Sequence, residues 1–167
     1  MAHIRKILVP VDGSPPSTAA LAQAVAIAED VGANVEVLYV RAPDEFEVGS
    51  STESSAGARR ETERTRTAAI AAARERLGEK LAARDERGDP IREILRAASD
   101  DRADLVVMGT HGRVGRLRAL IGSVAEAVVR NSPCPVLTVR EPDGEAESFA
   151  ERIHGRPGLG DHGPSSG

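Results

Sequence analysis

The chain has 167 residues, with 26 acidic and 22 basic side chains and a formal net charge of −4. This mildly acidic balance gives no general attraction to nucleic acid or to an anionic membrane surface. Three aromatic residues and no tryptophan leave no platform for stacking single-stranded bases. The single cysteine, Cys134, excludes an intrachain disulfide and a cysteine cluster for zinc, and we expect it to be buried for packing.

The first part of the chain is typical of a strand, a helix and a second strand. Residues 4–11 form a short apolar, β-branched run that ends at Asp12 and Gly13, which predicts a buried strand. Ser14 and Pro15 then place a capping residue and a proline at the start of a helix that Gly32 ends. Residues 34–40 predict the second strand, so the segment is a βαβ crossover.

Further elements follow in the same alternation. Residues 42–57 are polar and predict a long loop, and residues 58–81 predict a helix with Ile70 and Leu77 on its inner face. Asp89 and Pro90 open another helix, residues 103–109 predict a central strand, and Ser123 opens a helix that reaches about residue 130. Residues 134–139 predict the last strand.

Strands alternating with helices predict an α/β fold, a parallel sheet with helices on both faces, in one domain over residues 1–140. From residue 141 the composition cannot bury enough apolar surface to order itself, so residues 141–167 are expected to be a flexible tail. The N-terminal apolar run is too short for a signal peptide and no window is long enough to span a membrane. We therefore expect a cytoplasmic location.

A stretch rich in glycine and arginine follows the strand at 103–109. Residues 109–123 read GTHGRVGRLRALIGS, with four glycines, three arginines and no acid. Neither the Walker pattern nor the G-x-G-x-x-G pattern is present. Gly109 and Gly112 let the backbone approach a ribose and phosphates, and Gly122-Ser123 opens a helix whose N–H groups and dipole favour an anion. The stretch predicts a site for a small anionic ligand.

Several of these residues also have a purely structural interpretation. Ser123 and Glu126 stand in an S-x-x-E pattern, which is a capping box. Capping and phosphate binding are compatible, because a phosphate can meet N–H groups that the cap leaves open. Gly109 and Gly112 can be turn residues alone, and Asp12 can be a turn former at a strand end.

The spacing G-x-x-G, nine residues, then G-S is similar to the nucleotide-binding signature of the universal stress protein family. Four segments agree with that family over about Ile4 to Val139: KILVPVDGS, GDPIREIL, ADLVVMGTHGR and GSVAEAVVRNSPCPVLTV. Members that do not bind ATP generally lack the spacing, so the resemblance is to the ATP-binding subgroup. It implies that residues 1–140 are a nucleotide-binding domain with a Rossmann-like, adenine nucleotide α-hydrolase-like sheet in the order 3-2-1-4-5.

The resemblance also implies ATP, with magnesium, as the cofactor, and it assigns roles to individual residues. Adenosine would meet the ends of the first two strands, the ribose the end of the fourth, and the triphosphate the glycine-rich stretch. Asp12 would lie near the ribose or a magnesium ion. The implied cofactor-binding residues are Val11, Asp12, Val40, Met108, Gly109, Gly112, Arg113, Gly122, Ser123 and Val124.

One segment departs from the family pattern. Residues 79–87 read EKLAARDER, without the β-branched residues of an ordinary third strand, and their composition is helical. We predict that the third strand is short or absent. That strand would lie at an edge in the implied order, so its loss need not damage the nucleotide site.

The resemblance implies a homodimer that forms through the last strand, Val136–Val139, because exposed strand edges pair readily. Neither nucleic acid nor a membrane is expected as a partner. The implied function is a nucleotide-dependent regulatory module of the stress response. The alternatives are a slow ATPase, for which no residue is clearly placed to orient water, and a dimeric interaction protein that is independent of nucleotide.

Overall fold

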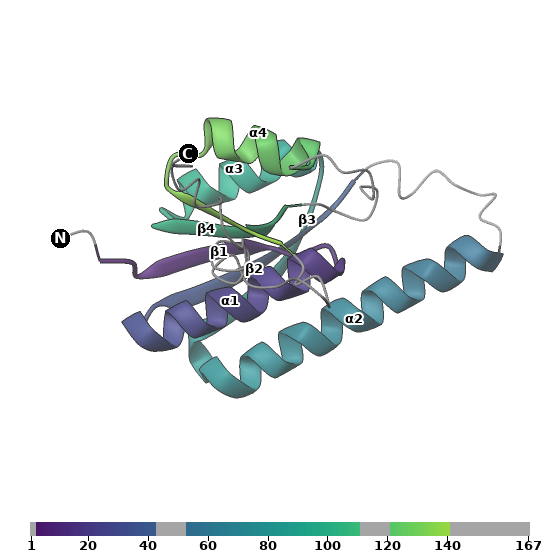
Figure 1. The fold of residues 1–167 in the computed structure, drawn as a ribbon, viewed down its shortest axis with the longest axis horizontal. Helices are drawn as coiled ribbons and strands as arrows, with labels where there is room; N and C mark the ends of the chain where they lie inside the picture. Colours follow the sequence, from purple (N-terminus) through teal and green to yellow (C-terminus); the bar gives the residue numbers. More distant parts are fainter. Residues whose placement is uncertain (1–2, 43–52, 111–120, 141–167) are drawn as a thin grey trace, which may run out of the picture.

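A computed structural model describes residues 3–42, 53–110 and 121–140, and its centre is a five-stranded parallel sheet (Figure 1). The strands lie in the order β3-β2-β1-β4-β5, which confirms the expected α/β fold and strand order. Their bounds are β1 (Lys6–Pro10), β2 (Asn34–Arg41), β3 (Leu81–Arg87), β4 (Leu105–Gly109) and β5 (Val136–Val139). The expected tail, residues 141–167, lies outside the described residues.

Helices cover both faces of the sheet. Helices α1 (Pro15–Val31) and α2 (Glu53–Leu77) pack on one face, and α3 (Pro90–Asp100) and α4 (Ser123–Asn131) pack on the other (Figure 1). Side chains of β1 alternate between the two cores, with Ile7 and Val9 toward α1 and Leu8 toward α3. All three are fully buried, as a central parallel strand requires.

The ends of the helices follow from local sequence. Asp89 accepts a hydrogen bond from the backbone N–H of Arg92 at 2.9 Å, which confirms the predicted cap of α3. Gly32 ends α1 in the left-handed conformation, with φ of 75°. Ser14 occupies the N-cap position of α1, but its side chain makes no capping hydrogen bond to that helix. In the described residues no helix is long and apolar enough to cross a membrane.

Helix α2 begins and ends earlier than predicted. It starts at Glu53, so the prediction of a loop through residue 57 is wrong at its C-terminal end, and it ends at Leu77, followed by a 3-10 turn (Gly78–Lys80). Leu77 is buried and Ile70 packs against the same core, which confirms the predicted inner face.

The prediction of a short or missing third strand is wrong. β3 has seven residues, and every one of them is in register with a residue of β2, from Leu81 opposite Val35 to Arg87 opposite Arg41. An edge strand needs little apolar surface, and Leu81 alone is buried in this one. Pairing along β2 therefore overrides the helical propensity of EKLAARDER.

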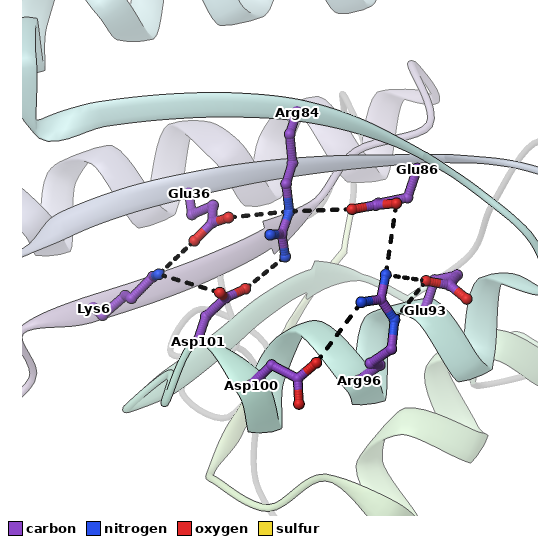
Figure 2. Close-up of polar contacts among 8 residues, drawn as sticks. All are labelled: Lys6, Glu36, Arg84, Glu86, Glu93, Arg96, Asp100 and Asp101. Atoms are coloured by element: carbon purple, nitrogen blue, oxygen red, sulfur yellow. Dashed lines mark hydrogen bonds and ion pairs between the residues drawn. The ribbon is translucent and has the colours of Figure 1, made fainter.

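Charged side chains of β3 belong to a network of ion pairs on the face that α3 covers (Figure 2). Arg84 Nη2 lies 2.5 Å from Asp101 Oδ2, at the end of α3. Its Nε lies 3.1 Å from Glu36 Oε1, close enough for an ion pair although not oriented as a hydrogen bond. Glu36 also contacts Lys6 of β1 at 2.6 Å. The network thus joins three strands and a helix where apolar side chains would otherwise pack.

Arg96 of α3 extends the network toward the end of β3. Its guanidinium lies 2.6 Å from Glu93, 3.5 Å from Glu86 and 3.7 Å from Asp100 (Figure 2). Exposed pairs of this kind contribute little individually. Glu36 differs because only 11% of its side chain is exposed and it faces two cations.

We predict that Glu36→Gln lowers the free energy of unfolding by about 2 kcal/mol, because Lys6 and Arg84 then share only the carboxylate of Asp101. Urea unfolding followed by circular dichroism measures the change. Glu79→Gln, in the exposed 3-10 turn, is the matched control and should change stability little. Equal stabilities of the two variants would contradict the assignment of Glu36 as the centre of the network.

Candidate functional site

A cleft of about 480 Å³ lies at the carboxyl ends of β1, β2 and β4. β1 stands between β2 and β4, so the chain leaves the sheet in opposite directions on its two sides, where α/β sheets characteristically bind ligands. Six segments of the chain supply the walls. The lining residues are Pro10, Val11, Asp12, Ser17, Leu38, Val40, Ala42, Pro90, Ile94, Met108, Gly109, Thr110, Gly122, Ser123, Val124 and Ala125.

The turn between β1 and α1 fixes the carboxylate of Asp12 in the cleft wall. Asp12 Oδ1 accepts hydrogen bonds from the backbone N–H of Ser14 at 3.0 Å and from the Ser14 hydroxyl at 2.6 Å. Gly13 between them has φ of +82°, a conformation that glycine adopts without strain. The structural interpretation of Asp12 as a turn former is therefore confirmed, and the turn also holds this carboxylate against the cleft.

Gly109 ends β4 against the first turn of α1. A Cβ on Gly109 would lie 2.8 Å from the backbone carbon of Pro16 and 2.9 Å from the backbone nitrogen of Ser17, closer than real Cβ atoms come. Its lack of a side chain is thus required by packing between strand and helix. The same closeness brings the N-terminus of α1 up to the cleft, where Ser17 is buried and donates to the Ser14 carbonyl at 2.9 Å.

Hydrogen bonds around Thr110 hold the start of α4 beside the end of β4. The Thr110 N–H donates to the Val139 carbonyl at 2.9 Å, and the Thr110 carbonyl accepts from the Gly122 N–H at 2.7 Å. Thr110 and Gly122 are therefore hydrogen-bonded directly to each other. The Gly122 N–H is already used in this way and is not an open donor for an anion.

The start of α4 differs from the predicted capping box. Gly122 is the N-cap, the helix begins at Ser123, and no side chain makes a capping hydrogen bond there. Glu126 instead pairs with Arg130 at 3.0 Å. The capping interpretation of Ser123 is wrong because Ser123 stands one position inside the helix. The first-turn N–H groups of Ser123, Val124 and Ala125 lack intrahelical acceptors by helix geometry, and all three residues line the cleft.

Part of the cleft wall is apolar. Leu38 and Val40 of β2, Ile94 of α3 and Met108 of β4 contribute to one hydrophobic cluster, and each also lines the cleft. Leu38, Ile94 and Met108 are at most 5% exposed. The cleft lining therefore combines apolar side chains of β2, α3 and β4 with the first-turn backbone donors of α4.

The structure brings together eight of the ten predicted site residues. Val11, Asp12, Val40, Met108, Gly109, Gly122, Ser123 and Val124 line the cleft, whereas Gly112 and Arg113 lie outside the described residues. Pro90 and Ile94 of α3 also line the cleft, although no sequence pattern marks them as site residues. The Asp89-Pro90 pattern predicts a helix start, but nothing in it shows that this helix begins beside the end of β2.

Comparison with known proteins identifies the fold. Residues 3–140 match the model of the universal stress protein family. The chain belongs to that family. A universal stress protein of Methanocaldococcus jannaschii is 37% identical over 145 residues, which cover 84% of this chain and 85% of that protein. The solved universal stress protein UspA from Lactobacillus plantarum is 30% identical, with a TM-score of 0.63 over 84% of this chain and all of that one.

Two solved universal stress proteins contain adenine nucleotides. One is in complex with cAMP (24% identity, TM-score 0.58, 84% of this chain and 99% of that one). The other, from Archaeoglobus fulgidus, is in complex with dAMP (21% identity, TM-score 0.56, 83% of this chain and 99% of that one). At these identities, the similarity of this chain to both proteins shows a shared fold only.

We predict opposite effects from the same substitution at two glycines. Gly109→Ala should lower the free energy of unfolding by about 1–3 kcal/mol, because its Cβ would press on the backbone of α1. Gly57→Ala should raise it by about 0.5–1 kcal/mol, since Gly57 is helical and a Cβ there meets nothing within 4 Å. Chemical denaturation measures both, and a neutral Gly109→Ala would contradict the close approach.

Proposed function

We propose that this universal stress protein binds ATP in the cleft and acts in the cytoplasm as a nucleotide-dependent regulatory module of the stress response. The observation that carries the proposal is the mixed lining of the cleft, in which apolar side chains of β2, α3 and β4 accompany the first turn of α4. A purine nucleotide combines the same two features, an apolar ring and phosphates that need hydrogen-bond donors.

The apolar part of the lining suits the adenine ring. Leu38, Val40, Ile94 and Met108 offer a surface against which a flat ring packs, and Val40 ends β2 where backbone groups can meet the ring edge. In the proposal Val11 and Asp12 face the adenosine from β1, and Gly109 faces the ribose.

The phosphate end relies on backbone donors rather than on side-chain cations. The first-turn N–H groups of Ser123 and Val124 and the dipole of α4 favour an anion. Gly122 leaves room at the entry to the helix. In the proposal Gly112 and Arg113, outside the described residues, complete the contacts with the triphosphate.

Magnesium would depend on the nucleotide for most of its ligands. Among the described residues no group of three His, Cys, Asp or Glu side chains lies together to hold a metal ion. Mg²⁺ commonly binds through phosphates, waters and one or two carboxylates, and Asp12 supplies a carboxylate in the cleft wall. The residues present therefore fit a magnesium ion that arrives with ATP.

A binding role is favoured over hydrolysis. Among the described lining residues Asp12 is the only ionisable one, and its Oδ1 is engaged by Ser14. No second group in the described wall is placed to take a proton from an attacking water. Two fold neighbours were solved in complex with cAMP and dAMP, which supports adenine-nucleotide binding.

We include a homodimer in the proposal, formed by the edge of β5. The two edges of the sheet differ: β3 carries Arg84, Asp85, Glu86 and Arg87, whereas β5 is the uncharged sequence VLTV, with Leu137 37% exposed. Charges on an edge strand oppose strand addition, so β5 is the edge that favours pairing with a second copy.

We predict that purified protein binds Mg·ATP and that Gly122→Val with Ser123→Ala abolishes the binding while preserving the fold. Isothermal titration calorimetry measures the affinity, and circular dichroism measures the fold. Gly122 has φ of −74° and ψ of 158°, which valine also adopts, so the double variant should fold. At 100 times Kd, ATP should add about 2.7 kcal/mol to the stability of the wild type only.

Phosphate release in the same samples separates binding from hydrolysis. A rate no higher than that of the double variant supports the regulatory module, and a clearly higher rate supports the slow ATPase. Undiminished affinity in the double variant would overturn the site, and the absence of heat with either ATP or AMP would favour the nucleotide-independent interaction protein.

For the dimer, we predict that Thr138→Pro gives a monomer with an intact sheet. The carbonyls of Pro135 and Val139 accept hydrogen bonds from the β4 side. Because the backbone groups of successive strand residues point to opposite sides, the N–H of Thr138 points toward the open edge. Analytical ultracentrifugation of the variant and the wild type measures the oligomeric state. An unchanged dimer in the variant, or a monomeric wild type, would rule out the β5 interface.

A further inference from the structure

Helix α2 carries a buried arginine for which the cleft alone gives no role. Arg66 is 6% exposed, and its guanidinium carbon lies 3.5 Å from the centroid of the Tyr39 ring. Nη2 donates to the two carboxylate oxygens of Glu63 at 2.7 and 2.8 Å. Nη1 is buried without a hydrogen-bond acceptor in the described part of the chain. A cation buried with an open donor opposes folding, and stacking on a ring only partly offsets that cost.

Arg66 is part of what we call the seat of α2, the contacts of Thr62 and Arg66 with Gly13 and Tyr39. A Cβ on Gly13 would lie 2.5 Å from the Thr62 carbonyl oxygen, so the backbone of α2 rests directly on the turn after β1. One helical turn further along α2, Arg66 rests on Tyr39 near the end of β2. The seat thus joins one helix to two strand ends.

Both strand ends in the seat also form the cleft. Gly13 directly follows Asp12, and Tyr39 stands between Leu38 and Val40. Asp12, Leu38 and Val40 all line the cleft. Because side chains alternate along a strand, Tyr39 faces α2 while its neighbours face the other side of the sheet. A shift of α2 on its seat therefore moves backbone that borders the cleft.

The N-terminal half of α2 projects beyond the sheet (Figure 1). Residues 57–61 are exposed, and among residues 56–77 of the helix the first buried one is Arg66. The position of this projecting half relative to the sheet therefore depends on the seat.

We propose that Arg66 is a positioning residue that couples the cleft to α2, so that bound nucleotide and a tightly seated helix stabilise each other. The inference rests on the proposed function of the cleft. Nucleotide that fixes Asp12 and Val40 also fixes Gly13 and Tyr39, and linkage requires that a secure seat strengthens nucleotide binding by the same factor. The projecting half of α2 then reports occupancy of the cleft to the surface.

Tyr39 is the only tyrosine of the chain, so 3-fluorotyrosine labels the seat at a single position. We predict that Mg·ATP shifts the single ¹⁹F resonance of the wild type, with the same Kd that calorimetry gives. Arg66→Met should weaken ATP binding roughly 10-fold, a common size of coupling between sites. Its unfolding midpoint without nucleotide should be unchanged or higher, because an apolar side chain replaces an incompletely paired cation.

Two further variants serve as controls. Arg64→Met makes the same change at an exposed position of α2 and should bind ATP as the wild type does. Arg66→Lys keeps the charge but loses the planar face over Tyr39, and it should fall between the wild type and Arg66→Met. Should Arg66→Met fail to fold, the wild-type ¹⁹F titration and Arg66→Lys decide the question.

Two results would overturn the coupling while leaving the proposed function intact: wild-type affinity in folded Arg66→Met, or a ¹⁹F resonance of the wild type that stays in place at saturating ATP. The absence of any ATP binding by the wild type is a different failure, because it removes the proposed function and the coupling with it. A purely structural role for Arg66 would lower the unfolding midpoint of Arg66→Met without moving the wild-type resonance.

Discussion

Burial of the central strand β1 on both faces is the constraint on which the rest of the structure depends. Ile7, Leu8 and Val9 are fully buried, two against one helical layer and one against the other. Such a strand needs a neighbour on each edge and helices above and below it. Its carboxyl end is then enclosed by the ends of β2 and β4 and by the helices that start there, so the cleft is a consequence of the way in which the core is covered.

Sequence patterns predicted the parts of the fold in which local signals and burial agree. The apolar runs of β1, β2 and β4, the Asp89 cap and the Gly32 stop each carry their own signal, and each was found where expected. The eight site residues found in the cleft were predicted because strand ends and a family signature marked them. The wall formed by Pro90 and Ile94 was missed because it depends on tertiary packing, which no local pattern encodes.

β3 and the start of α4 show how tertiary context changes local preference. Residues 81–87 have the composition of a helix, yet β2 offers them a complete set of backbone partners, and Glu36 and Asp101 neutralise Arg84. Ser123 has the sequence of a capping residue, yet the hydrogen bond from Gly122 to Thr110 sets the helix start one residue earlier in the chain. In both places a contact distant in sequence outweighs a signal worth about 1 kcal/mol or less.

The cleft is built from the ends of elements, so its shape depends on contacts made just behind it. Gly109 allows β4 to touch the first turn of α1, and Gly13 allows the turn after β1 to touch α2. Arg66 differs from these glycines because its burial is itself unfavourable, while its guanidinium packs α2 against Tyr39. An apolar residue at position 66 would pack better in the core, but it would link α2 less specifically to Tyr39 of β2. An incompletely paired cation at the seat is therefore consistent with the proposed coupling, in which the position of α2 and the positions of the strand ends depend on each other.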